Sequence, residues 1–228
     1  MATKTIPWNT GSGNIILNYS GEGDDTVLVS SDTANSLSTP RSQTLTFKTS
    51  GNEVTRQVTV VQAAKQKTQG TFTGHPTSYD SDHAYASISS AANGYADSDS
   101  TNYATINLTT GSRATTYMYY KFDTSSIPAN ATIKSVSCTC KCYISNTNSN
   151  RIATRQVRLY SGTTAKGSAE TVSNSTDEFE ITAGTWSRSE LNDARIRLYA
   201  VRGTNQTSGS QYFRFYGATL TVEYEYDE

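Results

Sequence analysis

The sequence lacks the features on which most catalytic and nucleic-acid-binding proteins depend. Over 228 residues, 19 Lys and Arg stand against 20 Asp and Glu, and a net charge of −1 excludes general attraction to nucleic acid or anionic lipid. There are two histidines, His75 and His83, and no nucleophile-elbow, zinc-protease, phosphate-loop or dinucleotide motif. We therefore predict no enzymatic activity. A glycosidase stays open as an alternative, because the separation of its two carboxylates is defined in space.

Long hydrophobic runs and a secretory leader are also absent. No apolar stretch approaches the roughly 20 residues of a membrane-spanning helix. No succession of basic, apolar and small residues follows Met1. We therefore predict that the protein has no membrane partner and is made in a reducing cytosol.

Cysteine is scarce and confined to one place. Cys138, Cys140 and Cys142 alternate along a single stretch. In an extended strand, neighbours at this spacing lie about 6.5 Å apart, at the edge of disulfide geometry. A zinc site would need a fourth ligand, and neither histidine is close in sequence. We expect three buried free thiols that act as small apolar residues, with zinc binding as the alternative.

What the sequence does contain is the composition of β-strands. Ser and Thr exceed a quarter of the residues and there are 15 Tyr, which suits a pleated, half-exposed surface. The strongest signal covers residues 115–144, where two stretches of period-two alternation are joined by turn-forming residues 123–130. We expect this pair of strands to form the spine of a β-sandwich, with Tyr117, Tyr119 and Tyr143 on the face opposite the core.

The alternation predicts an all-β chain with two domains. These are a small immunoglobulin-like N-terminal sandwich at 1–65, a linker at 66–74, and an eight-stranded jelly-roll β-sandwich at 75–228. The strands expected in the first domain are 14–19, 26–30, 43–49 and 53–62. The strands expected in the second domain are 84–90, 104–109, 114–122, 131–144, 154–160, 178–182, 194–201 and 211–226.

Three local patterns make sharper predictions. The apolar residues Phe213 and Phe215 are at odd positions, whereas those after Gly217 are at even positions, so a β-bulge near Gly217 is expected. Residues 187–190 (SRSE) match a capping box and predict a short helical turn that ends before residue 195. Residues 50–52 (SGN) predict the tight turn of a hairpin.

Two regions resemble known families. Residues 41–62, RSQTLTFKTSGNEVTRQVTVVQ, resemble the last two strands of BACON-type immunoglobulin-like modules, which implies a non-catalytic spacer or adhesive unit, often in a carbohydrate-rich setting. In the second domain FDTSSIPANATI, TWSRSELNDARIRLYAVRG and FRFYGATLTVEYEY together resemble jelly-roll modules of phage virion proteins and of carbohydrate-binding-like domains. The succession of both modules resembles capsid-decorating or head-fibre proteins of crAss-like and related tailed phages.

One candidate site is a cation site in an acidic stretch. Asp80, Asp82, Asp97 and Asp99 lie in a region without Lys or Arg. Alternate carboxylates in loops can supply oxygen ligands to calcium. We expect no cofactor, with calcium at these residues as the alternative. The alternative is that these are solvated turn residues, since the EF-hand spacing is absent.

The other candidate site is a set of aromatic residues. Exposed tyrosines on a sheet stack against sugar rings or pack in a subunit interface. The candidates are Tyr117, Tyr119, Tyr143, Tyr212 and Tyr216. Burial under a loop or a second sheet is the alternative for each. The arginines of the second half are expected to pair with Asp and Glu at sheet surfaces rather than to bind phosphate.

These patterns and resemblances predict a phage virion structural protein that decorates the capsid. We expect the N-terminal module to attach to the major capsid protein or another virion protein. The jelly roll would form a homo-oligomer, a dimer or trimer, or contact a host glycan. We expect the protein to be made in the bacterial host cytoplasm, with no nucleic-acid partner. The alternative is a non-catalytic carbohydrate-binding adhesion module of a tail or a cell envelope.

Overall fold

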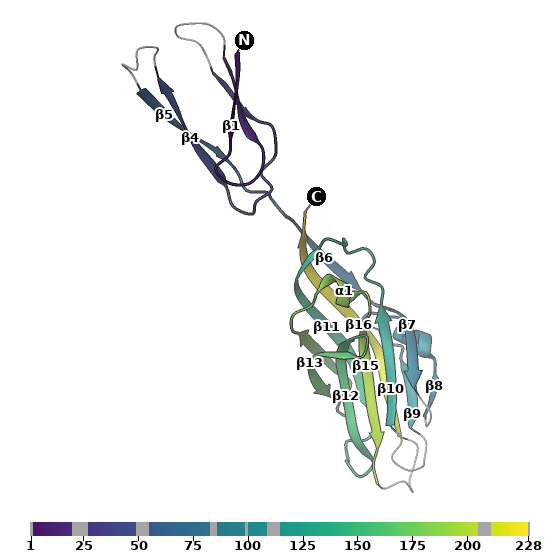
Figure 1. The fold of residues 1–228 in the computed structure, drawn as a ribbon. Coiled ribbons are helices and arrows are strands. Elements are labelled where there is room, and N and C mark those ends of the chain that lie inside the picture. Colours follow the sequence, from purple (N-terminus) through teal and green to yellow (C-terminus); the bar gives the residue numbers. More distant parts are fainter. Residues whose placement is uncertain are drawn as a thin grey trace. The chain divides into compact units, whose positions relative to one another are not determined.

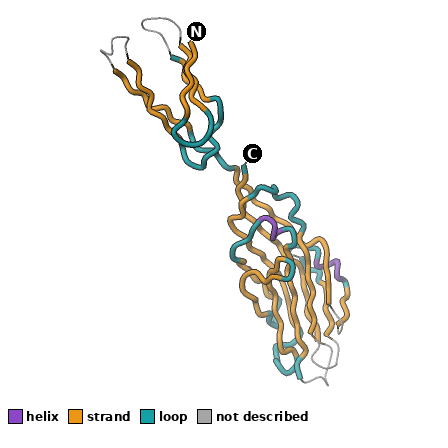
Figure 2. The backbone as a smooth tube through the Cα atoms, viewed as in Figure 1, coloured by secondary structure: helices purple, strands orange, loops and turns teal. Residues whose placement is uncertain are grey.

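The computed structural model divides the chain into two compact units, residues 1–67 and 68–228 (Figure 1). The structure describes residues 2–19, 27–48, 55–82, 86–98, 100–108, 115–204 and 211–227. The hairpin turn predicted at 50–52 lies outside the described residues. Both units are built from antiparallel strands, and the described part of the C-terminal unit adds two short helical turns (Figure 2), which confirms the all-β fold class. Within the described residues, no helix is long and apolar enough to span a membrane.

The N-terminal unit is a small sandwich of two sheets. Apolar residues from both sheets meet in a core of Trp8, Ile15, Leu17 and Leu45. The first sheet contains β1 (Ala2–Pro7), β2 (Asn14–Tyr19) and β3 (Leu28–Ser31), and the second contains β4 (Arg41–Lys48) and β5 (Thr55–Gln62). Since a unit of this size buries little apolar surface, we expect it to be marginally stable on its own.

Arg41 joins the two sheets of this unit from the inside. Its side chain is 1% exposed, and Nε donates a hydrogen bond of 2.8 Å to Oε1 of Gln62. Nη2 donates to the carbonyl oxygen of Thr33 at 3.1 Å, and the guanidinium lies 4.6 Å from the ring centroid of Trp8. The Arg and Gln at the two ends of the BACON-like stretch are therefore hydrogen-bonded to each other. Trp8 packs in the core of its own unit.

The C-terminal unit is a β-sandwich of two antiparallel sheets, the architecture of the predicted jelly roll. The five-stranded sheet has the order β13–β12–β15–β10–β7, and the six-stranded sheet has the order β14–β11–β16–β9–β8 with β6 paired to β16. The strands of the first sheet are β7 (Pro76–Asp82), β10 (Thr115–Phe122), β12 (Ile152–Ser161), β13 (Thr164–Thr171) and β15 (Ala194–Arg202). The strands of the second are β6 (Thr68–Gly74), β8 (Ala86–Ser89), β9 (Ala104–Leu108), β11 (Thr132–Ile144), β14 (Asp177–Ala183) and β16 (Gln211–Tyr226).

The strands β10 and β11, expected to form a pair, lie in different sheets. β10 pairs with β15 and β7, whereas β11 pairs with β16 and β14. The turn between them therefore crosses from one sheet to the other. Arg188 holds this turn by donating to the carbonyl oxygens of Thr124 and Ile127, at 3.2 and 2.9 Å. The side chain of Thr124 in turn donates to the carbonyl oxygen of Leu191 at 2.9 Å.

The interior of the sandwich is formed by the alternation that the sequence shows. Cys138, Cys140 and Cys142 are fully buried and form no disulfide, as predicted, and they pack with Met118 and Phe215 in the core. Burial raises the pKa of the Cys138 thiol well above its ordinary value, with the neighbouring Cys140 adding to the effect. These side chains therefore act as small apolar groups.

The predicted β-bulge is present at Gly217. Lys141 pairs with Gly217 and Cys142 with Phe215, so that Tyr216 is the extra residue of β16. The extra residue lets apolar side chains at odd positions before the bulge and at even positions after it face the same core, since Phe215 and Ala218 are both fully buried. The φ angle of Gly217 is +144°, a conformation that side chains with a Cβ rarely adopt.

The sequence prediction missed four strands, and β6 corrects the predicted linker. β6 occupies most of residues 66–74, and only residues 63–67 separate β5 from it. Its inward positions include Gly70, where a Cβ would lie 2.5 Å from the ring of Tyr224. Because glycine at an inward position supplies no apolar side chain, the sequence of β6 does not show the alternation that predicts a strand. The strands β1, β7 and β13 were missed as well, since small and polar residues dominate them.

The capping box also forms as predicted. The helical turn α1 (Arg188–Leu191) begins after Ser187, whose side chain accepts from the backbone N–H of Glu190, while the Glu190 carboxylate accepts from the backbone N–H of Ser187 at 2.8 Å. Lys166 of β13 donates to the same carboxylate at 2.5 Å. These contacts tie the edge strand β13 to α1. The second short helix, η1 (Ala91–Gly94), is a 3₁₀ turn between β8 and β9.

Candidate functional site

Nine side chains on three neighbouring strands form a regular grid on the outer face of the five-stranded sheet. The register places β10, β15 and β12 side by side and sets three residues opposite one another in each row. The rows are Lys121, Arg195 and Tyr160; Tyr119, Arg197 and Arg158; and Tyr117, Tyr199 and Gln156. We call these nine residues the platform. Successive rows lie about 6.7 Å apart and the strands about 4.8 Å apart, so the platform covers roughly 13 by 10 Å.

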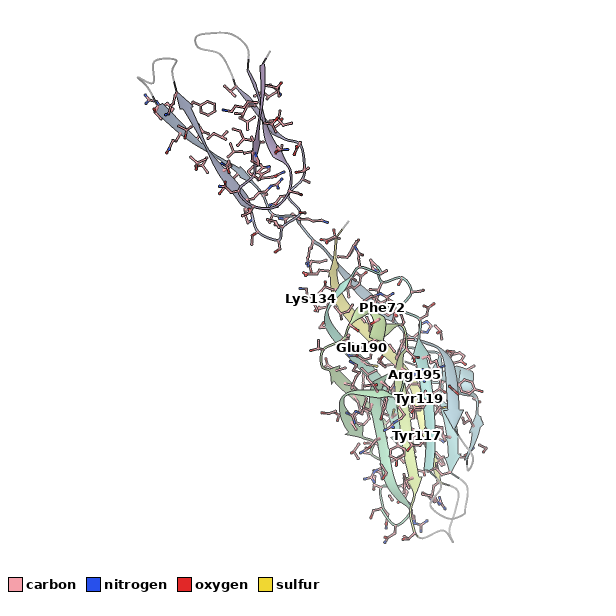
Figure 3. All side chains as sticks on the ribbon, viewed as in Figure 1. Phe72, Tyr117, Tyr119, Lys134, Glu190 and Arg195 are labelled. Atoms are coloured by element: carbon pink, nitrogen blue, oxygen red, sulfur yellow. The ribbon has the colours of Figure 1, made fainter. Side chains whose placement is uncertain are left out.

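Strand periodicity sends these side chains outward. The residues between them, among them Met118, Ile196 and Leu159, are buried in the sandwich core. Because successive side chains of a strand point to opposite faces, the platform residues must point away from that core. Figure 3 shows Tyr117, Tyr119 and Arg195 following one another along the same sheet.

The four tyrosine rings of the platform form two packed pairs, in which Tyr160 is buried, at 5% exposed, and the other three rings are half-buried. Tyr117 and Tyr199 stack with their centroids 4.8 Å apart and their planes 7° from parallel. Tyr119 and Tyr160 meet edge to face with centroids 5.9 Å apart. The guanidinium of Arg197 lies between them, 4.3 Å from the Tyr160 centroid, 5.1 Å from Tyr117 and 5.0 Å from Tyr199. Such contacts fix the rings in place before any ligand arrives.

The platform is cationic. Lys121 and Arg195 have carboxylates beside them, Asp80 at 3.8 Å and Asp193 respectively. Arg158 and Arg197 form no ion pair with a carboxylate in the described part of the chain, so the expectation that sheet arginines pair with Asp and Glu holds for Arg195 but not for these two. The Nε atoms of both are enclosed without a hydrogen-bond partner among the described residues.

The phenol group of Tyr199 adds no negative charge to the platform at neutral pH. Burial raises the pKa of Tyr199, and Tyr117 raises it further by its proximity and its hydrogen bond, although Arg197 acts in the opposite direction. The Tyr199 hydroxyl group therefore serves as a hydrogen-bond donor and acceptor. The platform combines flat apolar rings, hydroxyl groups, one amide and four cations.

The remaining predicted tyrosines belong to a second cluster on the other sheet. Tyr143 and Tyr212 stack with centroids 6.1 Å apart, and Arg214 lies 4.8 Å from the Tyr212 ring centroid. Tyr143 therefore does not share a face with Tyr117 and Tyr119, because β10 and β11 belong to different sheets. Tyr216 is only 9% exposed.

A segment of the chain lies over part of this second cluster. The backbone N–H of Ala218 donates to the carbonyl oxygen of Ala96 at 3.0 Å, and that of Ser98 donates to the side chain of Thr219 at 3.3 Å. Tyr103 then packs edge to face on Tyr216 with centroids 5.2 Å apart. For Tyr216 the alternative of burial under a loop is therefore correct.

The predicted calcium residues come from two separate places. Asp80 is in β7 of the five-stranded sheet, whereas Asp97 follows η1 in the segment that packs on β16. The side chain of Asp82 and all of Asp99 lie outside the described residues. Among the residues that are described, no three His, Cys, Asp or Glu side chains gather as metal ligands would. Calcium binding stays a prediction.

The sequence predicted two of the nine platform residues as candidates, Tyr117 and Tyr119. It missed Tyr160 and Tyr199, and it took Arg197 for a partner of acidic residues. A signal was available in the alternation of β15, where Arg195, Arg197 and Tyr199 occupy every second position. What the sequence did not show is that β12, β15 and β10 are neighbours, since long connections separate them.

Comparisons with known proteins identify no family for the chain. No protein-family model matches it, and no curated protein matches it. Among solved structures, a family 11 carbohydrate-binding module of the cellulosomal cellulase Lic26A-Cel5E of Clostridium thermocellum is similar at 13% identity, with a TM-score of 0.31. The match covers 69% of this chain and 95% of that chain. A likeness at this level carries no argument about the ligand.

Proposed function

We propose that the C-terminal unit is a non-catalytic carbohydrate-binding module and that the platform is its binding face. The observation that carries this proposal is two packed pairs of tyrosine rings on one sheet face, linked through Arg197 and with hydrogen-bonding side chains between them. The apolar faces of sugar rings stack on aromatic side chains, and their hydroxyl groups need donors and acceptors beside those rings. The platform offers both at adjacent grid positions.

The rigidity of the face supports binding rather than a passive surface. Tyr117 and Tyr199 are held parallel, and Arg197 touches three rings at once. A ligand that binds to rings already in place loses little free energy to side-chain ordering. No carboxylate is among the nine residues, so the platform has no pair of acids for glycoside hydrolysis. This favours binding without cleavage.

The virion role stays a prediction that depends on sequence resemblance alone. A glycan-binding unit on a capsid or head fibre would contact the host surface, with the N-terminal unit attached to the particle. Size-exclusion chromatography with light scattering measures the oligomeric state of the protein in solution. A stable dimer or trimer favours a fibre or decoration protein, whereas a monomer favours a simple binding module.

Affinity electrophoresis against a panel of polysaccharides, followed by calorimetry on the polymer retained, tests the binding face. The double variant Tyr117→Ala/Tyr199→Ala removes the stacked pair of the platform. Since an aromatic contact contributes about 0.5–1.5 kcal/mol, we expect the affinity to fall roughly tenfold or more.

A matched control exists on the opposite sheet. Tyr143→Ala/Tyr212→Ala removes another stacked tyrosine pair with the same change in composition, and it should leave affinity unchanged. Melting curves establish that both variants are folded. Full binding by the folded Tyr117→Ala/Tyr199→Ala variant would refute the platform as the binding face.

A further inference from the structure

From the charge of the platform we infer that its ligand is an acidic polysaccharide, one that carries carboxylate groups. This inference rests on the proposed function, and it names the chemical class of the ligand. Four of the nine platform residues are cations and none is an acid, whereas the whole chain has a net charge of −1. The positive charge is therefore concentrated on this face and does not reflect the composition of the protein.

Two of these cations lack a counter-charge. Asp80 and Asp193 accompany Lys121 and Arg195. Arg158 and Arg197, in contrast, have no carboxylate partner in the described part of the chain. Both Nε atoms are enclosed without a hydrogen-bond partner there.

The position of these two arginines makes the missing counter-charge more costly. Arg158 and Arg197 are directly opposite on the neighbouring strands β12 and β15. Like charges at such positions destabilise a sheet, because the Cβ atoms lie only about 5 Å apart. The rings around Arg197 offset part of this cost through cation–π contact, but no ring lies over Arg158 in the described residues. An anion held between the two guanidinium groups would remove the repulsion.

The chemistry of the pair favours a carboxylate on a sugar. Guanidinium groups bind planar carboxylates through paired hydrogen bonds, which are stronger than those between neutral groups. In the adjoining row, Tyr117 and Tyr199 would stack the neighbouring sugar ring. Nucleic acid fits less well, because the cations are confined to one small patch and do not form a stripe that could follow a backbone. A polyuronate satisfies both the rings and the arginine pair.

Matched polymers separate charge from sugar shape. The full-length protein is titrated with polygalacturonate and with the same polymer after methyl esterification, which keeps the rings and removes the charge. Alginate and hyaluronan, each beside its carboxyl-reduced form, extend the series, and neutral glucans and a single-stranded oligonucleotide complete it. For at least one polymer, we expect the charged form to bind at least tenfold more tightly than its uncharged counterpart. The affinity for the charged form should fall as the salt concentration is raised.

The variant Arg158→Gln removes one charge of the pair, and Arg214→Gln is the same change on the opposite sheet. We expect Arg158→Gln to abolish most of the preference for the charged polymer, and Arg214→Gln to keep it. The wild type could bind the charged and neutral forms equally while Tyr117→Ala/Tyr199→Ala binds neither. That result would overturn the preference for an acidic ligand and leave the carbohydrate-binding function standing. Binding to no polysaccharide would overturn both, and oligonucleotide binding that requires Arg158 would assign the face to nucleic acid.

Discussion

The β-bulge at Gly217 offers a sharp test of how the sandwich is built, through the substitution Gly217→Ala. The φ angle of +144° is one that a residue with a Cβ rarely adopts. In addition, a Cβ at this position would lie 2.3 Å from the carbonyl oxygen of Asp97 and 2.4 Å from that of Ala96. Both atoms belong to backbone, so the contact is relieved only by moving the segment that packs on β16.

The expected cost can be worked out from these two effects. A residue held in such a backbone conformation costs about 1–3 kcal/mol. Displacing the segment also threatens the hydrogen bond of 3.0 Å from the N–H of Ala218 to the carbonyl oxygen of Ala96, and a hydrogen bond of this kind contributes about 1 kcal/mol. We therefore expect Gly217→Ala to lower the free energy of unfolding of the C-terminal unit by roughly 2–4 kcal/mol.

Urea denaturation followed by tryptophan fluorescence measures this difference. The chain has two tryptophans, Trp8 in the N-terminal unit and Trp186 in the C-terminal unit, both buried. In a Trp8→Phe background the signal therefore reports on the C-terminal unit alone. The matched control is Gly184→Ala, because a Cβ there meets nothing within 4 Å; its effect should stay within about 0.5 kcal/mol. Equal stability of the two variants would refute the account of the bulge.

Two further predictions concern the carboxylate of Glu190 and the three buried cysteines. Hydrogen bonds from Lys166 and the Ser187 backbone lower the pKa of Glu190 from 4.5 to about 2 in the folded protein. The ionised Glu190 carboxylate therefore stabilises the fold above its ordinary pKa, and this stabilisation is lost as the pH falls through the pKa of the folded state. The melting temperature of Glu190→Gln should lie below that of the wild type at pH 7 and converge with it near pH 2. The three buried cysteines should react with a thiol reagent only after denaturation, because burial excludes the reagent and raises the pKa of Cys138; rapid labelling of the native protein would contradict their placement.

Features that depend on neighbouring residues were predictable from sequence. The bulge follows from a change of parity between Phe215 and Ala218, and the capping box from the spacing of Ser187 and Glu190. The burial of the cysteines follows from their alternation with polar residues along β11. Each of these is decided within a few residues of the chain, where side-chain period and hydrogen-bond geometry act directly.

Features that depend on which strands become neighbours were not predictable in the same way. The strands β10 and β11 look like a hairpin, yet the turn between them crosses from one sheet to the other, where Arg188 holds it. The sequence alternation is the same in both cases, because a strand buries one face whether or not its sequence neighbour pairs with it. Likewise β6 was read as a linker, since glycine at inward positions such as Gly70 makes room for Tyr224.

The two aromatic clusters differ in whether another segment of the chain packs on them. Both sheets carry an arginine among three tyrosine rings, Arg197 on one and Arg214 on the other. On the six-stranded sheet the bulge raises Tyr216 from the strand, and the segment through Ala96 and Tyr103 packs on it. That cluster therefore already has a partner within the chain. The platform keeps a regular grid across β10, β15 and β12. We propose that a ligand supplies the counter-charge for Arg158 and Arg197, which lie opposite each other on that grid.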